Sequence, residues 1–310
     1  MPLLRDVFLA FSTNTLVRWF VVGFPLSRRV SRRFVAGETL DEAIQVVKKL
    51  NERGIQVTFD QLGESVTNES EARAAKDGYL RALDAIAANK VSSQVSVKLS
   101  QMGLDLSPDL CLDNMRQIVS RAKAIGTLVT IDMEDSKHTQ ATLNIFKTLR
   151  KEFDNVGIVI QAYLYRSEED IKALASMSAT VRLCKGAYKE PAEVAFPQKK
   201  DVDANMLKLS QMLLQPNGHS NAAYLQLATH DEKIINWAKQ YTTEQKVDRQ
   251  RFEFQMLYGI RNDLQRRLAA DGYTMRVYVP YGTHWYPYFM RRLAERPANV
   301  IFLVSNLFKS

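Results

Sequence analysis

The sequence predicts an α/β protein, a (βα)8 TIM-type barrel preceded by N-terminal helices. Short runs of β-branched and other apolar residues recur along the chain, each separated from the next by a helix-length amphipathic segment. There are eight such runs, the number of parallel strands that closes a barrel. No glycine-rich dinucleotide turn follows the first run, which disfavours the alternative, an open doubly wound sheet.

Length and composition are consistent with one large domain and an anionic partner. The chain has 310 residues, and α/β barrels of about 250 residues are single domains. We expect an N-terminal helical arm over residues 1–36 and a catalytic barrel over residues 37–310. The net charge of +8 favours a phosphate-bearing cofactor, an acidic metabolite or an anionic membrane surface. Nucleic acid is not expected, because the chain has no zinc spacing, RNA-binding aromatic motif or long basic run. Two distant cysteines argue against a disulfide framework and favour a reducing, cytoplasmic location.

The arm leaves two interpretations open. Its apolar stretch over residues 16–25 is too short to span a bilayer, which needs about 20 residues, and it has no signal-peptide cleavage pattern. Arg28, Arg29, Arg32 and Arg33 follow it. The arm either packs on the barrel with its charges in water or makes peripheral contact with anionic lipid on the inner face of the cytoplasmic membrane.

The expected elements follow in order. Thr39 and Glu42 form a capping box at the start of a helix, and Ser107 is the expected N-cap of a helix over residues 107–124. Further helices are expected over residues 139–153 and 201–214. The strands are expected at residues 54–60, 94–98, 128–132, 157–161, 180–185, 225–230, 252–257 and 275–278. After the last strand, Thr283 is the expected N-cap of a helix that carries two adjacent arginines.

Seven polar side chains occur at or just past the carboxyl ends of the predicted strands. Buried strands rarely tolerate such groups, whereas barrel enzymes place their active sites on this rim. The shared position of these polar residues therefore predicts an active site at the carboxyl ends of the strands. The residues are Lys98, Asp132, Gln161, Arg182, Lys185, His230 and Tyr278.

This rim is rich in cations and amides, which predicts a carboxylate ligand together with a phosphate-bearing cofactor. No metal is expected, because no two histidines have helical i, i+4 spacing and the positive field opposes a divalent cation. A Schiff-base aldolase stays open, since Lys98 or Lys185 could have a lowered pKa among other cations. The spacing alone does not separate this from cofactor-dependent redox chemistry.

Several motifs together resemble the proline dehydrogenase family, in its monofunctional bacterial type. They occur in the family's order over about residues 37–307. The motifs are Ser96-Val97-Lys98-Leu99-Ser100, Thr130-Ile131-Asp132-Met133-Glu134, Gln161-Ala162-Tyr163, the run from Val181 to Tyr188, Ala228-Thr229-His230, and Tyr278 followed by Gly282-Thr283-His284 and Arg291-Arg292.

The resemblance implies a flavoenzyme that uses FAD to oxidise L-proline to Δ1-pyrroline-5-carboxylate by hydride transfer. It implies that the electrons pass to a membrane quinone, in the first step of proline catabolism to glutamate. A hydroxyproline dehydrogenase is the nearest alternative, and a tyrosine at position 278 favours proline. The Schiff-base aldolase is the alternative from another class.

The resemblance also implies roles for individual residues. It places Asp132 and Arg182 at catalytic positions, and we expect Asp132 to orient neighbouring cations such as Lys98. The substrate-binding residues would be Lys98, Leu257, Tyr278, Arg291 and Arg292. The cofactor-binding residues would be Met133, Gln161, Lys185, Gly186, Ala187, Thr229 and His230.

Overall fold

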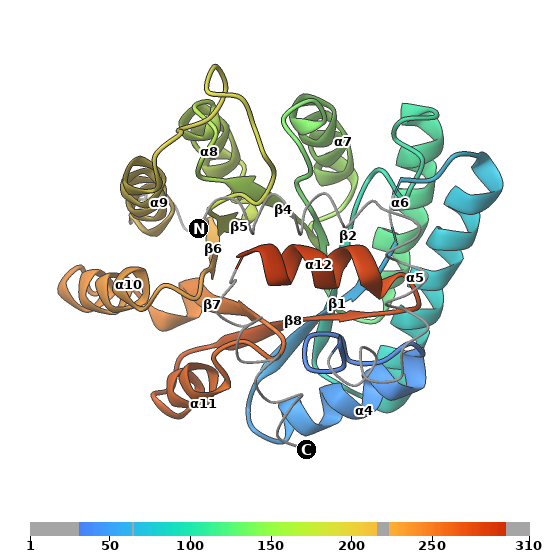
Figure 1. The fold of residues 1–310 in the computed structure, drawn as a ribbon, viewed down its shortest axis with the longest axis horizontal. Coiled ribbons are helices and arrows are strands. Elements are labelled where there is room, and N and C mark those ends of the chain that lie inside the picture. Colours follow the sequence, from blue (N-terminus) through green and yellow to red (C-terminus); the bar gives the residue numbers. More distant parts are fainter. Residues whose placement is uncertain (1–30, 64, 216–222, 296–310) are drawn as a thin grey trace.

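Eight parallel strands close into a barrel in chain order, with the last strand paired to the first. The computed structural model describes residues 31–63, 65–215 and 223–295, except for the side chains of residues 291 and 293–295. This topology confirms the predicted (βα)8 barrel (Figure 1). The strands are β1 (Gln56–Gln61), β2 (Ser93–Val97), β3 (Val129–Ile131), β4 (Val156–Gln161), β5 (Thr180–Cys184), β6 (Tyr224–Ala228), β7 (Phe252–Leu257) and β8 (Met275–Tyr281).

Helices surround the strands. Two of them begin with the capping chemistry that the sequence predicts. Thr39 and Glu42 form the capping box of the first described helix, and Ser107 caps a helix that begins with Pro108. The helices are α4 (Leu40–Asn51), α5 (Glu69–Asn89), α6 (Pro108–Ala124), α7 (Thr139–Glu152), α8 (Ser167–Ser176), α9 (Lys199–Leu214), α10 (Glu232–Glu244), α11 (Asn262–Ala270) and α12 (Trp285–Glu295).

The start of α12 differs from the prediction. The helix begins at Trp285, so His284 rather than Thr283 precedes it. Strand β8 continues through Pro280 to Tyr281, and the chain turns at Gly282, whose φ of +123° favours glycine. In Figure 1, α12 lies across the end of the barrel.

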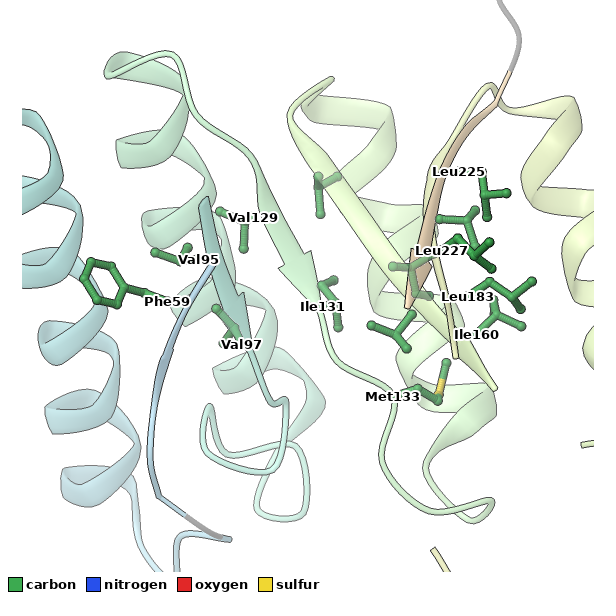
Figure 2. Packing of buried hydrophobic residues seen from close by; sticks show 14 of the residues in the cluster. Phe59, Val95, Val97, Val129, Ile131, Met133, Ile160, Leu183, Leu225 and Leu227 are labelled. Carbon is green, nitrogen blue, oxygen red and sulfur yellow. The ribbon is translucent and has the colours of Figure 1, made fainter. Parts of the chain in front are cut away.

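Along most strands, side chains alternate between an apolar outer face and a polar inner face. Phe59, Val95 and Val97 are fully buried and belong to the apolar layer between strands and helices (Figure 2). Gln226 on β6 donates to Gln94 on β2 at 3.3 Å; these strands are not neighbours, so the bond crosses the barrel interior. The inside of this barrel is therefore polar.

A smaller apolar cluster joins α12 to the N-terminal end of the described chain. Phe34 and Val35 pack with Trp285 and Phe289, and the Gly282 N–H donates to the Gly37 carbonyl at 2.9 Å. Most of the predicted arm over residues 1–36 lies outside the described residues, so its lipid contact stays a prediction. Within the described chain, no helix combines the length and apolarity that crossing a bilayer requires.

Candidate active site

A cavity of about 620 Å³ opens among the carboxyl ends of the strands. Its volume suits a small-molecule ligand. The predicted site residues whose side chains are described all line it: Lys98, Asp132, Met133, Gln161, Arg182, Lys185, Gly186, Ala187, Thr229, His230, Leu257, Tyr278 and Arg292. The side chain of Arg291 lies outside the described residues, so its predicted role stays a prediction. The fold thus gathers residues from distant parts of the sequence into one site.

Asp132, which follows β3, is the centre of a hydrogen-bond network. Its carboxylate accepts from Ser96 Oγ at 2.6 Å, from Arg182 Nη1 at 2.9 Å and from the Tyr278 hydroxyl at 2.9 Å. Burial and the Asp132 charge raise the pKa of Tyr278 well above its ordinary value, so the phenol keeps the proton that it donates. The network holds Arg182 and Tyr278 in fixed orientations inside the barrel.

Arg182 and Tyr278 lie deeper than predicted. Both stand within their strands, β5 and β8, instead of at the ends, and Arg182 is 4% exposed. The strands of a closed barrel are staggered, so residues at different distances from their strand ends can meet at one level. The Arg182 guanidinium carbon lies 5.3 Å from the centre of the Tyr278 ring, within the range of a cation–π contact.

Lys98 pairs with an acid that was not among the predicted site residues. Its Nζ lies 2.9 Å from Asp60 Oδ1 and 3.8 Å from Asp132 Oδ2, so Asp60 is the closer of its two carboxylate partners. Burial lowers the pKa of Lys98, but the charges of Asp60 and Asp132 outweigh burial and raise it, so the amine stays protonated. Asp60 lies near the end of β1, a strand for which no polar end residue was predicted.

A second group of charges lies where β5 and β6 end. The ammonium of Lys185 is 2.6 Å from Asp203 and 2.9 Å from Asp231, and Lys199 lies 3.6 Å from Asp231. Next to it, His230 Nε2 accepts from the Leu257 N–H at 2.9 Å, so a neutral imidazole here carries its proton on Nδ1. This side of the cavity presents lysine ammonium groups to a ligand.

Close backbone approach explains the glycine in the loop after β5. Gly186 has φ +108°, and a Cβ there would lie 2.2 Å from an atom of the Tyr163 ring. Any side chain would therefore clash with Tyr163 or displace it. Glycine at this position therefore allows the loop backbone to pack closely against Tyr163.

Among the buried polar atoms of the cavity, Gln161 Oε1, Arg182 Nε and Arg182 Nη2 have no hydrogen-bond partner among the described residues. Leaving a buried polar atom unpaired costs about 1–3 kcal/mol, and more when the group is charged. Gln161 and Arg182 both line the cavity. These atoms are therefore candidates for contact with a bound ligand.

Arg292 reaches the cavity from α12. Its guanidinium carbon lies 5.1 Å from the centre of the Tyr288 ring, and Tyr288 also lines the cavity. The arginine is therefore supported by an aromatic face one turn earlier in the same helix. A cation so placed can bind the carboxylate of a small substrate.

Comparison with known proteins agrees with this site. A family profile described as proline dehydrogenase matches residues 43–305. The chain is 46% identical to proline dehydrogenase 1 of Bacillus subtilis over 307 residues, covering 99% of this chain and all of that protein. It is 42% identical to proline dehydrogenase of Deinococcus radiodurans over 285 residues, covering 90% of each.

Solved structures show the same relationship. A crystal structure of proline utilization A (PutA) from Bdellovibrio bacteriovorus, inactivated by N-propargylglycine, superposes with a TM-score of 0.80 at 25% identity. The match covers 94% of this chain and 36% of that longer protein. The chain therefore belongs to the proline dehydrogenase family.

Proposed function

We propose that this protein is an FAD-dependent enzyme that oxidises L-proline to Δ1-pyrroline-5-carboxylate. The observation that carries the proposal is the cavity itself. It combines cations suited to a carboxylate with buried donors and acceptors that the described protein leaves unpaired. Membership of the proline dehydrogenase family supports the same conclusion.

The residues present fit a flavin. Gln161 and Arg182 offer an amide oxygen and two guanidinium N–H groups that match the mixed donors and acceptors along the edge of an isoalloxazine ring. Lys185 offers a cation for a diphosphate, and Gly186 allows close backbone approach. When bound, a flavin accepts a hydride from the carbon next to the substrate nitrogen.

The other residues bind and orient the amino acid. Lys98 and Arg292 supply charge for its carboxylate, and Arg291 is proposed to add a third cation on the same helix. Tyr278, fixed by its hydrogen bond to Asp132, packs against the ring, and Leu257 covers an apolar side. Orientation of the reacting carbon is the main contribution that such contacts make to the rate.

The aldolase alternative fits the structure poorly. A Schiff-base lysine needs a lowered pKa to be nucleophilic, whereas Asp60 and Asp132 raise the pKa of Lys98. Lys185 is likewise enclosed by two carboxylates. Lys98 is therefore held as an ammonium ion, and Lys185 is engaged in two ion pairs.

Turnover of L-proline with a soluble dye as electron acceptor tests the proposal. The expected result is dye reduction with formation of a cyclic imine, and slower turnover of trans-4-hydroxy-L-proline. Arg292→Met should raise KM for proline on the order of 10²-fold, which corresponds to losing a charge-assisted contact, while flavin content stays unchanged. The absence of proline turnover by flavin-loaded protein would refute the proposal.

We further propose a membrane quinone as the electron acceptor and a cytoplasmic location with peripheral contact at the inner membrane face. The basic residues of the N-terminal arm and the net charge of +8 support attraction to anionic lipid. Deleting residues 1–30 should abolish co-sedimentation with anionic vesicles and leave turnover with the soluble dye intact. Co-sedimentation that survives the deletion would contradict the arm's role.

A further inference from the structure

Asp60 lines the cavity, and among the described residues its ion pair there is with Lys98. Its side chain is 1% exposed, and that of Lys98 is 18% exposed. An acid buried this deeply is stable in its charged form only with a close cation or several hydrogen bonds. The 2.9 Å contact with Lys98 meets that need.

The Lys98 ammonium has three N–H donors, and the acceptors around it show which carboxylate holds it. Asp132 is 3.8 Å away and already accepts from Ser96, Arg182 and Tyr278. Asp60 is thus the carboxylate that holds Lys98 by a hydrogen bond. The remaining N–H donors can then turn toward a ligand in the cavity.

We propose that Asp60 is a positioning residue for substrate binding: it holds the Lys98 ammonium at the cavity and keeps it protonated, so that Lys98 can bind the substrate carboxylate. This inference rests on the proposed function and assigns a role to a residue that the family motifs quoted above do not include. Asp60 acts through Lys98 and does not itself contact the reacting atoms.

The groups that act on the charge of Lys98 come from three parts of the barrel. They are Asp60 on β1, Asp132 after β3 and, more weakly, Tyr188 in the loop after β5. Burial lowers the pKa of Lys98, and the two carboxylates raise it by more. Without Asp60, burial is opposed mainly by Asp132 at the longer distance. Lys98 would then lose its proton at a lower pH.

The test is Asp60→Asn in the flavin-loaded protein, with KM and kcat for proline measured from about pH 6 to about pH 9. As pH rises, KM of the variant should increase on the order of tenfold more than KM of the native protein, and kcat should change much less. Asp60→Glu, which restores the charge, should restore the native pH profile. A KM that follows the native profile in Asp60→Asn overturns the inference.

Glu253 provides a matched control. It is also 1% exposed and also pairs with a cation inside the barrel, at 2.7 Å from Arg276, yet it does not line the cavity. Glu253→Gln should lower the thermal unfolding midpoint without moving the pH profile of KM. If Asp60→Asn behaves like Glu253→Gln, the role of Asp60 is structural only and the inference is wrong.

A double-variant comparison separates action through Lys98 from direct action on the substrate. Asp60→Asn added to Lys98→Met should leave KM unchanged relative to Lys98→Met alone. Because this double variant leaves neither buried charge without its partner, it remains informative if Asp60→Asn alone does not fold. A further rise in KM in the double variant would contradict the inference.

Binding of cyclopentanecarboxylate distinguishes failure of this inference from failure of the proposed function. This ring carboxylate has no amine to oxidise, so its calorimetric affinity reports the Lys98 charge without turnover. The affinity of Asp60→Asn should fall with rising pH more steeply than that of the native protein. Parallel pH profiles would refute the role of Asp60 whether or not proline is oxidised.

Discussion

Two arginines inside the same barrel have opposite surroundings. Arg276 on β8 donates to both oxygens of Glu253 at 2.7 and 3.0 Å, to the Val57 carbonyl at 3.0 Å and to Gln56. Arg182 on β5 donates through Nη1 alone, to Ser96 and Asp132, and its Nε and Nη2 have no hydrogen-bond partner among the described residues. Both are nearly inaccessible, at 6% and 4% exposed.

The difference separates a structural arginine from a ligand-binding one. A guanidinium whose three nitrogens all donate to protein acceptors contributes to the fold. A guanidinium with unpaired donors destabilises the unliganded protein, a cost that a bound ligand can offset. Arg182 lines the cavity and Arg276 does not, so the unpaired donors and the cavity coincide. The Arg276 and Arg182 variants below test this distinction.

Arg276→Met should have the largest effect on stability. It leaves Glu253 buried without its cation, which lowers the free energy of unfolding by about 3–5 kcal/mol. Denaturant unfolding measures this, and the rate of flavin reduction by proline in folded protein should stay near native. A reduction rate that falls as far as in Arg182→Met would remove the distinction between the two arginines.

Arg182→Met should have the next largest effect, on the chemistry. The rate of anaerobic flavin reduction by proline should fall on the order of 10²–10³-fold, as expected when a buried donor to developing charge is lost. Stability should fall less than in Arg276→Met, because Asp132 keeps the hydrogen bonds from Ser96 and Tyr278. Stopped-flow absorbance gives the rate, and an unchanged rate would contradict the assigned role.

The smallest effect is expected at His138, a partly exposed residue that pairs with two carboxylates. His138 Nδ1 lies 2.6 Å from Asp135 and Nε2 2.7 Å from Asp105, a geometry that suits an imidazolium donating from both nitrogens. Partial burial lowers the pKa of His138, but the hydrogen bonds to Asp105 and Asp135 outweigh it and raise the pKa above the ordinary 6.5. The stabilisation is therefore complete below pH 6.5 and disappears as pH rises through the folded-state pKa.

Thermal unfolding across this pH range measures the His138 contribution. Relative to His138→Gln, the native protein should lose about 1–3 °C of its stability advantage between acidic and alkaline pH, the scale of a partly exposed ion pair. His284→Gln is the control, since no carboxylate pairs with His284 among the described residues. A stability difference between native protein and His138→Gln that does not vary with pH would refute the imidazolium pair.

The architecture could be predicted because the eight strands carry their signal locally. Apolar runs, helix caps and polar strand ends are all visible in short stretches such as the capping box of Thr39 and Glu42. The prediction from polar strand ends placed Lys98, Asp132 and Lys185 at one site, and all three line the cavity, because parallel strands end at one edge. The strand predicted over residues 54–60 also ends in an acid, Asp60, but the prediction did not include it among the site residues.

The pairings could not be predicted in the same way. Asp60 and Lys98 are 38 positions apart, and Glu253 and Arg276 are 23 apart. Which cation meets which acid depends on barrel closure and strand stagger, which no local pattern contains. The same stagger explains why Arg182 and Tyr278 stand below the rim instead of on it.

The visible absorption spectrum of the purified protein, before and after anaerobic addition of L-proline, tests the central claim most directly. The account predicts flavin bands that bleach when proline is added, since the cavity combines cations for a carboxylate with the proposed flavin contacts. Protein that stays colourless after reconstitution with FAD, or flavin bands that proline leaves unchanged, would contradict the account.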